Sequence, residues 1–476
     1  MITYQNHING EWVSPHSGTY SQVTNPADLD DVFAQAPLSD AQDVQAAISA
    51  CEQAEEKWAQ TPAPARGKIL YRLADLLEEE AEDLAGILTR EEGKTLTEAR
   101  GEVLYSATEC RYMASEAYRL TGTTYPSETV GGMVCRVHVP LGTIAAINPW
   151  NYPVVTPIRK IAPALACGDT VLFKPAQNTP GTAVRLMELF QKAGVPNGVV
   201  NLICGSGSII GDLICDAPAV KGISFTGSTA VGRRIAARAG QRMAKIQLEM
   251  GGKNPAIVWN PKDMEDCADQ IAKSAFGGTG QKCTAISKVI VKREQAQELT
   301  DLLIGHAKKM VIGNGMQRGV TLAPLSTKQQ YENVKAYMAL AADTATVVYG
   351  GKALDNMNGY YVMPTIVTGV DGEHRLAKEE IFGPFLIIIP VSSYEEAIYV
   401  ANNVEYGLAS SVFTSEAALV KEYVTKIKSG MAHVNEQTTV IGSVPFGGMK
   451  NSGFGAFSNG DTAKDFYMQD KVIYFA

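Results

Sequence analysis

The sequence lacks the features that mark membrane, secreted and metal-dependent proteins. Its most apolar run, residues 381–391, is broken by glycine and proline and is too short to span a bilayer, and its N-terminus is polar. The eight cysteines include no CxxC pair, and the six histidines show no metal-binding spacing such as HExxH. We therefore expect a cytoplasmic protein with reduced thiols, no membrane partner and no metal site.

A basic surface is also missing. The net charge is −8, which argues against nonspecific binding of nucleic acid. With 45% hydrophobic and 19% charged residues, the composition is that of an ordinary globular protein, and 476 residues suffice for two or three domains. Internal repeats, low-complexity tracts and long linkers are absent.

The chain does contain a regular alternation of predicted strands and helices. Residues 8–12 predict a hairpin, residues 40–60 and 66–118 predict amphipathic helices, and residues 136–141 predict a strand. Buried strands are expected at 143–147, 170–173, 199–203 and 222–225, with helices between them, and a second such series begins near Pro255. This alternation predicts an α/β fold with two doubly wound domains.

One glycine-rich stretch, residues 276–284, delivers a single cysteine, Cys283. Glycine is a poor helix or strand interior, but it allows close backbone approach and places amide N–H groups beside the sulfur. A thiolate there is a nucleophile, and the N–H donors could stabilise an oxyanion. A buried, inert cysteine in a glycine loop is the alternative interpretation.

Two of the expected strands end in polar residues. The strand at 143–147 leads to Asn151, and the strand at 170–173 leads to Lys174. Ligands of doubly wound sheets bind beyond the carboxyl ends of strands, so Asn151 could donate to a reacting oxygen and Lys174 could hold a ribose or phosphate. A turn asparagine and a solvent lysine are the alternatives.

Two glycine-bearing turns, at 205–211 and 225–232, each open a helix. Such turns can present N–H groups to a pyrophosphate, although ordinary glycine turns look the same. Glu249, flanked by apolar residues and glycines, could be a general base with a raised pKa or simply a surface glutamate. Glu380 and Phe382 could support a ribose and a nicotinamide, or be a solvated acid beside a core ring.

Six segments in register, PWNYP, KPAQ, FTGST, LEMGGKNP, GQKC and EEIFGP, resemble the non-acylating NAD(P)-dependent aldehyde dehydrogenase superfamily. The likeness extends over nearly the whole chain. It implies that Cys283 is the nucleophile, Glu249 the general base, and Asn151 an oxyanion donor together with the Cys283 amide. The positions that match its cofactor-binding residues are Trp150, Lys174, Gln177, Gly207, Gly211, Phe225, Gly227, Ser228, Gly251, Glu380 and Phe382.

The resemblance implies oxidation of an aldehyde to a carboxylic acid through a Cys283 thioester, which Glu249 hydrolyses with an activated water. The glutamate favours hydrolysis over transfer to coenzyme A. Gln177 departs from the pattern, because NAD-preferring relatives usually carry a glutamate there that repels a 2′-phosphate. We therefore expect NADP or NAD as cofactor, with NADP favoured.

The substrate is less determined. Residues 156–160 resemble a segment of succinate semialdehyde and α-ketoglutarate semialdehyde dehydrogenases whose arginine meets the distal carboxylate, which makes Arg159 the candidate substrate anchor. An inter-helix salt bridge of Arg159 is the alternative. A second arginine of some relatives lies six residues before the nucleophile, where this chain has Gly277. Neutral and betaine-type aldehydes therefore stay open.

The resemblance also implies three parts: a dinucleotide-binding domain at 1–123 and 140–250, a catalytic domain at 251–440, and a small β oligomerisation extension at 124–139 and 456–476. Strand-forming residues in the extension would be exposed on a monomer, so we expect a homodimer or homotetramer. A non-catalytic binding or structural protein on the same fold is the rival of another class.

Overall fold

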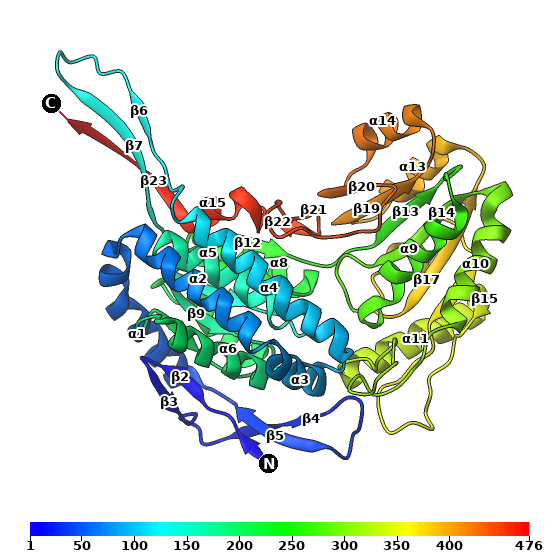
Figure 1. Ribbon diagram of the computed structural model, residues 1–476, viewed down its shortest axis with the longest axis horizontal. Helices are drawn as coiled ribbons and strands as arrows, with labels where there is room; N and C mark the ends of the chain where they lie inside the picture. The colour runs from blue at the N-terminus through cyan, green and yellow to red at the C-terminus, as the bar shows by residue number, and fades with distance from the viewer. Residues whose placement is uncertain (476) are drawn as a thin grey trace.

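The computed structural model describes residues 1–475; Ala476, the last residue of the predicted extension 456–476, lies outside the described residues. The chain forms two α/β lobes and a projecting β-arm (Figure 1). The first lobe holds the long helices of the N-terminal half, and the second follows Gly251. The predicted fold class, α/β with two doubly wound sheets and a small β extension, is confirmed.

The sheet of the first lobe has, within the described residues, the strand order β22-β12-β11-β8-β9-β10-β2-β3. Its strands are β2 (Asn6–Ile8), β3 (Glu11–Val13), β8 (Thr143–Ile147), β9 (Thr170–Lys174), β10 (Val200–Leu202), β11 (Val220–Thr226), β12 (Lys245–Glu249) and β22 (Gly453–Phe454). The strands from β12 to β10 run parallel. The chain order reverses between β8 and β11, which is where such sheets bind ligands.

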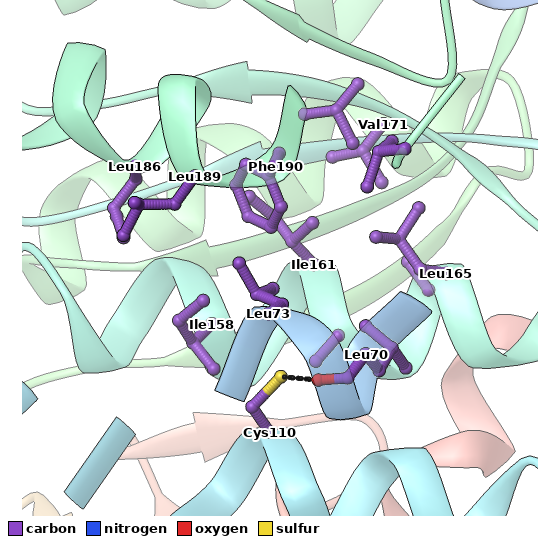
Figure 2. Close-up of a cluster of buried hydrophobic side chains, with 14 of the residues drawn as sticks. Leu70, Leu73, Cys110, Ile158, Ile161, Leu165, Val171, Leu186, Leu189 and Phe190 are labelled. Carbon is purple, nitrogen blue, oxygen red and sulfur yellow. Dashed lines mark hydrogen bonds between the residues drawn. The ribbon is translucent and has the colours of Figure 1, made fainter. Parts of the chain in front are cut away.

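Helices cover both faces of this sheet (Figure 1). They are α1 (Ala41–Gln60), α2 (Ala63–Glu79), α3 (Ala81–Glu92), α4 (Leu96–Glu116), α5 (Val155–Cys167), α6 (Pro180–Ala193), α7 (Gly207–Asp216), α8 (Thr229–Gln241) and α15 (Lys464–Tyr467). Figure 2 shows their apolar side chains meeting, with Leu73 and Ile161 below Phe190. The Cys110 thiol donates to the Leu70 carbonyl at 3.2 Å, so this cysteine belongs to the core.

The sheet of the second lobe has the order β15-β16-β17-β14-β13-β19-β20 among the described strands, and only its edge strand β15 is antiparallel there. The strands are β13 (Asn254–Val258), β14 (Ile286–Lys292), β15 (Thr346–Tyr349), β16 (Thr365–Thr368), β17 (Phe385–Val391), β19 (Ala409–Phe413) and β20 (Met431–Val434). The helices are α9 (Met264–Phe276), α10 (Ala296–Lys308), α11 (Lys328–Thr344), α12 (Arg375–Lys378), α13 (Tyr394–Asn402) and α14 (Ala417–Lys426).

The arm is an antiparallel sheet of β6 (Thr123–Tyr125), β7 (Met133–Pro140) and β23 (Met468–Phe475), and it projects from the first lobe (Figure 1). It is narrower than the predicted extension. Residues 456–467 return to the first lobe instead, where Phe466 and Tyr467 are fully or almost fully buried in its core. The physical reason is the aromatic pair itself, which gains more from burial than from exposure on an arm.

Short strands complete the fold. They are β1 (Ile2–Thr3), β4 (Tyr20–Thr24) and β5 (Val32–Pro37) in one sheet, and β18 (Tyr406–Gly407) with β21 (Met449–Lys450) in another. The hairpin predicted at 8–12 is confirmed: Asn9 and Gly10 turn with φ of 51° and 89° between β2 and β3. Across residues 1–475, no helix combines the length and apolarity needed to cross a membrane.

Candidate active site

The loop that carries Cys283 follows α9 as a tight turn, Gly277–Gly280. Gly278, Thr279 and Gly280 adopt φ of 61°, 55° and 66°, a conformation that favours glycine. A Cβ on Gly280 would lie 2.1 Å from the carbonyl oxygen of Gly383, so no other residue fits there. The glycines therefore bring the Cys283 loop against the segment that follows Glu380.

Backbone contacts fix Cys283 in place. The Asn254 side chain at the start of β13 donates to the carbonyls of Cys283 and Ala285 at 2.7 and 2.9 Å. The Thr438 hydroxyl donates to the next carbonyl, that of Thr284, at 2.6 Å. Cys283 itself is partly exposed, unlike the buried Cys110. The loop thus presents a thiol on a rigid backbone.

Asn151 reaches this loop from the other lobe. It follows β8, is 7% exposed, and its side-chain Nδ2 donates to the Gln281 carbonyl at 2.8 Å. An amide carries two N–H donors, so the second remains for an oxygen bound beside Cys283. The sequence placed these two residues far apart in the chain, and the fold brings them together.

A buried ion pair supports Asn151, and the sequence analysis missed it. Lys94 Nζ donates to Glu102 and to the Asn151 carbonyl, both at 2.7 Å. The other Glu102 oxygen accepts from the amides of Val154, the N-cap of α5, and Val155, its first residue, at 2.8 and 3.1 Å. The only local signal is the charged stretch 91–94, whose composition equally describes a solvated helix end.

Glu249 ends β12 and is 5% exposed, so it is not the surface glutamate of the alternative interpretation. Its Oε1 accepts a 3.4 Å hydrogen bond from the Ser458 hydroxyl, and its Oε2 is buried without a partner among the described residues. Burial raises the pKa of Glu249 above its ordinary value, and the positive charge of Lys160 opposes the rise. A carboxyl with one free oxygen and a raised pKa can accept a proton near neutral pH.

Lys160 is 1% exposed on α5 and donates to the Thr226 hydroxyl at 2.5 Å. Thr226 pairs with Glu249 across the parallel strands β11 and β12, which places the amine next to the carboxyl. Burial lowers the pKa of Lys160 from its ordinary value. The two groups therefore form a buried acid–base pair behind the Cys283 loop.

Burial raises the pKa of the Cys283 thiol to about 12. Among the charges that act on it, Arg159 lowers the pKa, whereas Glu249 and Glu380 raise it. The sulfur is therefore a neutral thiol in this state, and its use as a nucleophile requires a base that removes the proton.

Glu380 precedes the segment that packs against the Cys283 loop. Its Oε1 accepts from the Gly252 amide at 2.8 Å, and a Cβ on Gly251 would lie 2.2 Å from its Oε2. Burial raises the pKa of Glu380 to about 7. Phe382 is half-buried with φ of 58°, so it is not the core ring of the alternative interpretation, and it meets the Trp150 ring edge-on at 5.7 Å.

Lys174 ends β9 and is 5% exposed, not the solvent lysine of the alternative. Its amine donates to the Pro175 carbonyl at 3.0 Å, and burial lowers its pKa to about 8. The other predicted cofactor residues lie nearby in the fold: Gln177 is exposed after β9, Gly207 and Gly211 open α7, Phe225 is buried in β11, and Gly227 and Ser228 precede α8.

These features fit a dinucleotide. A buried amine at the end of β9, the N-termini of α7 and α8, and a partly buried carboxylate against the Gly251–Gly252 pair lie where a doubly wound sheet binds one. The Gly227 amide donates to the Glu249 carbonyl at 3.0 Å, which joins this region to the general-base candidate. Across residues 1–475, no group of three or more His, Cys, Asp or Glu is arranged to hold a metal.

Arg159, the predicted substrate anchor, faces Glu109 across the α4–α5 contact. Its Nη2 and Nε donate to the two Glu109 oxygens at 2.5 and 3.2 Å, with side chains 11% and 1% exposed. The guanidinium also lies 4.5 Å from the centroid of Phe446. Arg159 thus makes the inter-helix salt bridge and still acts electrostatically on Cys283.

The chain matches known proteins over its whole length. The model of the aldehyde dehydrogenase family matches residues 12–473. An α-ketoglutaric semialdehyde dehydrogenase of Bacillus subtilis is 40% identical, with 99% of this chain and 98% of the relative covered. A betaine aldehyde dehydrogenase of Staphylococcus aureus, solved with NAD+, superposes with a TM-score of 0.96 at 32% identity, covering 100% of this chain and 95% of that one.

An NADP-dependent enzyme of E. coli superposes with a TM-score of 0.97 at 33% identity, covering 100% of this chain and 98% of that one. Similar proteins therefore include structures described with either coenzyme. Family match, full-length identity and the shared fold agree with the presence of a cysteine in a glycine-rich turn together with a glutamate and an asparagine at strand ends. The chain belongs to the aldehyde dehydrogenase family and is an NAD(P)-dependent aldehyde dehydrogenase.

Proposed function

We propose that the protein oxidises a small anionic semialdehyde, of the α-ketoglutarate or succinate semialdehyde class, to the dicarboxylic acid. The observation that carries this is Arg159, a cation close enough to Cys283 to lower the pKa of its thiol. An aldehyde carbon on Cys283 would leave its distal carboxylate to be met by a guanidinium, which is a good carboxylate partner. The name of the 40% identical relative supports the same class.

In the proposed reaction, Glu249 accepts the thiol proton, directly or through a water, and Cys283 Sγ forms a bond to the aldehyde carbon. The oxyanion accepts from Asn151 Nδ2 and the Cys283 amide. When bound, NAD(P)+ would accept the hydride from the former aldehyde carbon, and the carbon would then remain on Cys283 Sγ as a thioester. After that first proton has passed to solvent, Glu249 takes a proton from a water as that water attacks the thioester carbon. The C–S bond breaks, the carboxylic acid departs, and the proton on Glu249 returns to Cys283 Sγ, which restores the thiol.

The residues that would hold the cofactor fall into three groups, according to the part of the cofactor that each would contact. Lys174 offers an amine and Glu380 a carboxylate, both suited to ribose hydroxyls. Gly207, Gly211, Gly227 and Ser228 lie where helix N-termini can receive a pyrophosphate. Trp150, Phe225, Gly251 and Phe382 shape the surroundings, with Gly251 leaving the space that Glu380 occupies.

For the coenzyme we infer a preference for NADP. Gln177 is exposed and uncharged, so nothing at this position repels a 2′-phosphate, and Lys174 nearby can pair with it. Initial rates with NADP should exceed those with NAD, and Gln177→Glu should reverse the order because a carboxylate accepts from both ribose hydroxyls. A large NAD preference of the unmodified protein would contradict this inference.

Oxidation of a neutral aldehyde is the second candidate, and Glu109 is the observation that favours it. Its two oxygens both bind Arg159, so the buried pair carries no net charge. A neutral aldehyde would then lose little binding free energy beside this pair. A carboxylated aldehyde would gain less binding free energy from it than from an unpaired guanidinium.

The test is coenzyme reduction with succinate semialdehyde, α-ketoglutarate semialdehyde, betaine aldehyde and hexanal. Because Arg159→Ala would leave Glu109 buried and unpaired, the variant to use is Glu109→Gln with Arg159→Met. It should raise KM for the carboxylated aldehydes and spare hexanal. Arg111→Met removes an exposed arginine pair of the same helix α4 and is the matched control. Equal loss on all substrates would reject the anchor role.

We also infer the three-part organisation implied by the sequence, with the arm as the contact between copies. The arm exposes Val472 (48%), Tyr474 (76%) and Phe475 (49%), and a strand that exposes large apolar side chains invites pairing. Light scattering should report a homodimer or homotetramer, and Tyr474→Asp should dissociate it. A monomeric unmodified protein would contradict this role of the arm.

A further inference from the structure

The two N–H donors of the proposed oxyanion site lie on different lobes. Asn151 follows β8 in the first lobe, whereas Cys283 follows the glycine turn Gly277–Gly280 at the end of α9 in the second lobe. Each donor must lie about 2.7–3.1 Å from the same developing oxyanion, and a misplacement of about 1 Å can cost roughly 100-fold in rate. The position of one loop relative to the other is therefore part of the catalytic geometry.

The start of α4 contacts the loops of both lobes. Glu98, in the first turn of this helix, accepts with its Oε1 from the Gly278 amide at 2.6 Å. Glu102, one turn later, accepts from Lys94 Nζ at 2.7 Å, and the same amine donates to the Asn151 carbonyl at 2.7 Å. Residues four apart lie on one face of a helix. One helix face therefore holds the glycine turn of the second lobe with Glu98 and the Asn151 loop of the first lobe with Glu102.

These contacts close into a ring of hydrogen bonds. The Gly278 carbonyl accepts from the Gln281 amide at 2.9 Å, and the Gln281 carbonyl accepts from Asn151 Nδ2 at 2.8 Å. The Asn151 carbonyl in turn leads back through Lys94 to Glu102. The ring thus leaves α4 in its first turn and returns to it one turn later. Because the ring is closed, Asn151 cannot shift against the glycine turn without loss of one of these hydrogen bonds.

The glycine turn needs such support. Thr279 lies in its middle with φ of 55°, a conformation that side chains other than glycine rarely adopt and that persists where the surrounding structure holds it. The Thr279 hydroxyl donates to the Ala323 carbonyl of the second lobe at 2.9 Å. Glu98 holds the preceding residue, Gly278, from the first lobe. The turn is therefore fixed from both lobes, and Glu98 provides the contact across them.

We infer that Glu98 is a positioning residue of the oxyanion site. With Glu102 as the fixed point on the other side, it sets the distance between Asn151 Nδ2 and the Cys283 amide. It acts through the Gly278 amide and the glycine turn, not by contact with the substrate. The inference rests on the proposed oxyanion role of these two donors, and it does not depend on which aldehyde or coenzyme the protein uses.

A purely structural role of Glu98 makes a different prediction. Its Oε2 accepts from the Thr95 amide and hydroxyl at 3.1 and 2.8 Å, and the Thr95 hydroxyl accepts from the Glu98 amide at 3.2 Å. This reciprocal pair caps the start of α4. Thr95→Ala opens the same cap but leaves the Gly278 contact in place, so it is the matched control. If capping were the only role of Glu98, both alanine variants would lose stability and activity alike.

The experiment compares two reactions of Cys283. Acylation by a p-nitrophenyl ester builds an oxyanion, whereas alkylation by iodoacetamide displaces iodide and builds none. Both are measured without coenzyme, acylation by the release of p-nitrophenol and alkylation by mass spectrometry of the peptide that carries Cys283. The thermal unfolding of each variant is measured as well.

For Glu98→Ala we expect acylation to slow about tenfold to hundredfold, no more than the loss of an oxyanion donor itself, with alkylation unchanged. Glu98→Gln keeps an oxygen for the Gly278 amide and should recover most of the rate. Thr95→Ala should lower thermal stability and leave acylation unchanged. If Glu98→Ala does not fold, Glu98→Asp replaces it, because this shorter side chain keeps the charge at the helix start but withdraws from Gly278. It should slow acylation in the same way.

Asn151→Ala separates this inference from the proposed function. If Asn151→Ala slows acylation no more than alkylation, the oxyanion role of Asn151 fails and this inference fails with it. If Asn151→Ala slows acylation selectively but Glu98→Ala does not, this inference alone is overturned. Equal slowing of both reactions in Glu98→Ala, or acylation slowed as much in Thr95→Ala, assigns Glu98 to the structure of the turn or of the helix cap and overturns it as well.

Discussion

Two carboxylates, the buried Glu249 and the partly exposed Glu380, both raise the pKa of the Cys283 thiol, and they differ in what the rest of the molecule does with them. Burial raises the pKa of both, and both lie beside the Gly251–Gly252 pair. Glu249 keeps one oxygen without a partner and faces the amine of Lys160. Glu380 has an oxygen bound to the Gly252 amide and packs where Gly251 has no side chain.

The difference teaches that burial alone does not assign a role to a carboxylate. A base needs a free lone pair directed at a proton, and an acceptor of ribose hydroxyls needs a fixed position. The orphan oxygen of Glu249 meets the first need, and the backbone hydrogen bond of Glu380 meets the second. Substitutions that remove the charge and keep the shape should therefore affect different steps.

The largest effect is expected from Glu249→Gln. An amide cannot accept the proton of the attacking water, so thioester hydrolysis should slow about 100-fold to 10,000-fold, the usual range for loss of a general base. Stopped-flow coenzyme reduction should still give a burst, slower than in the unmodified protein because the thiol proton must then pass to water, followed by a steady state that is slowed more. Equal slowing of burst and steady state would mean that Glu249 acts mainly on Cys283 and not on the water.

Glu380→Gln should act on the other step. The amide keeps the shape but loses the charged acceptor, which is worth about 1.5–3 kcal/mol, or roughly tenfold to hundredfold. The burst itself should slow and KM for the coenzyme should rise, while hydrolysis of a preformed thioester stays unchanged. A p-nitrophenyl ester, which acylates Cys283 without coenzyme, measures that hydrolysis separately. Slower ester turnover in Glu380→Gln would show that Glu380 also contributes to thioester hydrolysis, which contradicts the separate roles of the two carboxylates.

Much of this site was predictable, because its residues lie at strand ends and in glycine turns. Asn151, Lys174 and Glu249 each follow or end a short apolar run, and parallel strands carry such ends to one edge of the sheet. The glycines around Cys283 indicated close backbone approach, and Gly280 lies against Gly383 as that implies. Local sequence patterns were therefore informative wherever the backbone itself forms the site.

The residues that escaped prediction act through partners distant in the chain. Lys94 supports Asn151, and Glu109 neutralises Arg159, but the sequence analysis assigns no role to either residue. Nothing in the local spacing distinguishes a buried ion pair from an exposed one. The return of Phe466 and Tyr467 to the first lobe was missed for the same reason, because only the folded core offers them a place.

The pH dependence should separate the carboxylates next. Hydrolysis requires ionised Glu249, and burial raises its pKa, so the deacylation rate should rise with pH over a range above the ordinary carboxyl value of about 4.3. Lys160 lowers that pKa, so Lys160→Met should move the rising limb to higher pH. If the pH range over which the deacylation rate rises is unchanged in Lys160→Met, the ionisation of Glu249 does not determine that range.

The smallest effect is expected from Ser458→Ala. The hydroxyl donates to Glu249 at 3.4 Å and lowers the pKa of that carboxyl, but it also donates to the Phe446 carbonyl at 3.2 Å. Loss of one such bond costs about 0.5–1.5 kcal/mol, so hydrolysis at neutral pH should slow only a few-fold. The pH range over which the deacylation rate rises should shift to higher pH by less than in Lys160→Met. Ser415→Ala, at an exposed serine, controls for the substitution itself. A shift as large as that of Lys160→Met would make the hydroxyl, and not the amine, the main group that tunes Glu249.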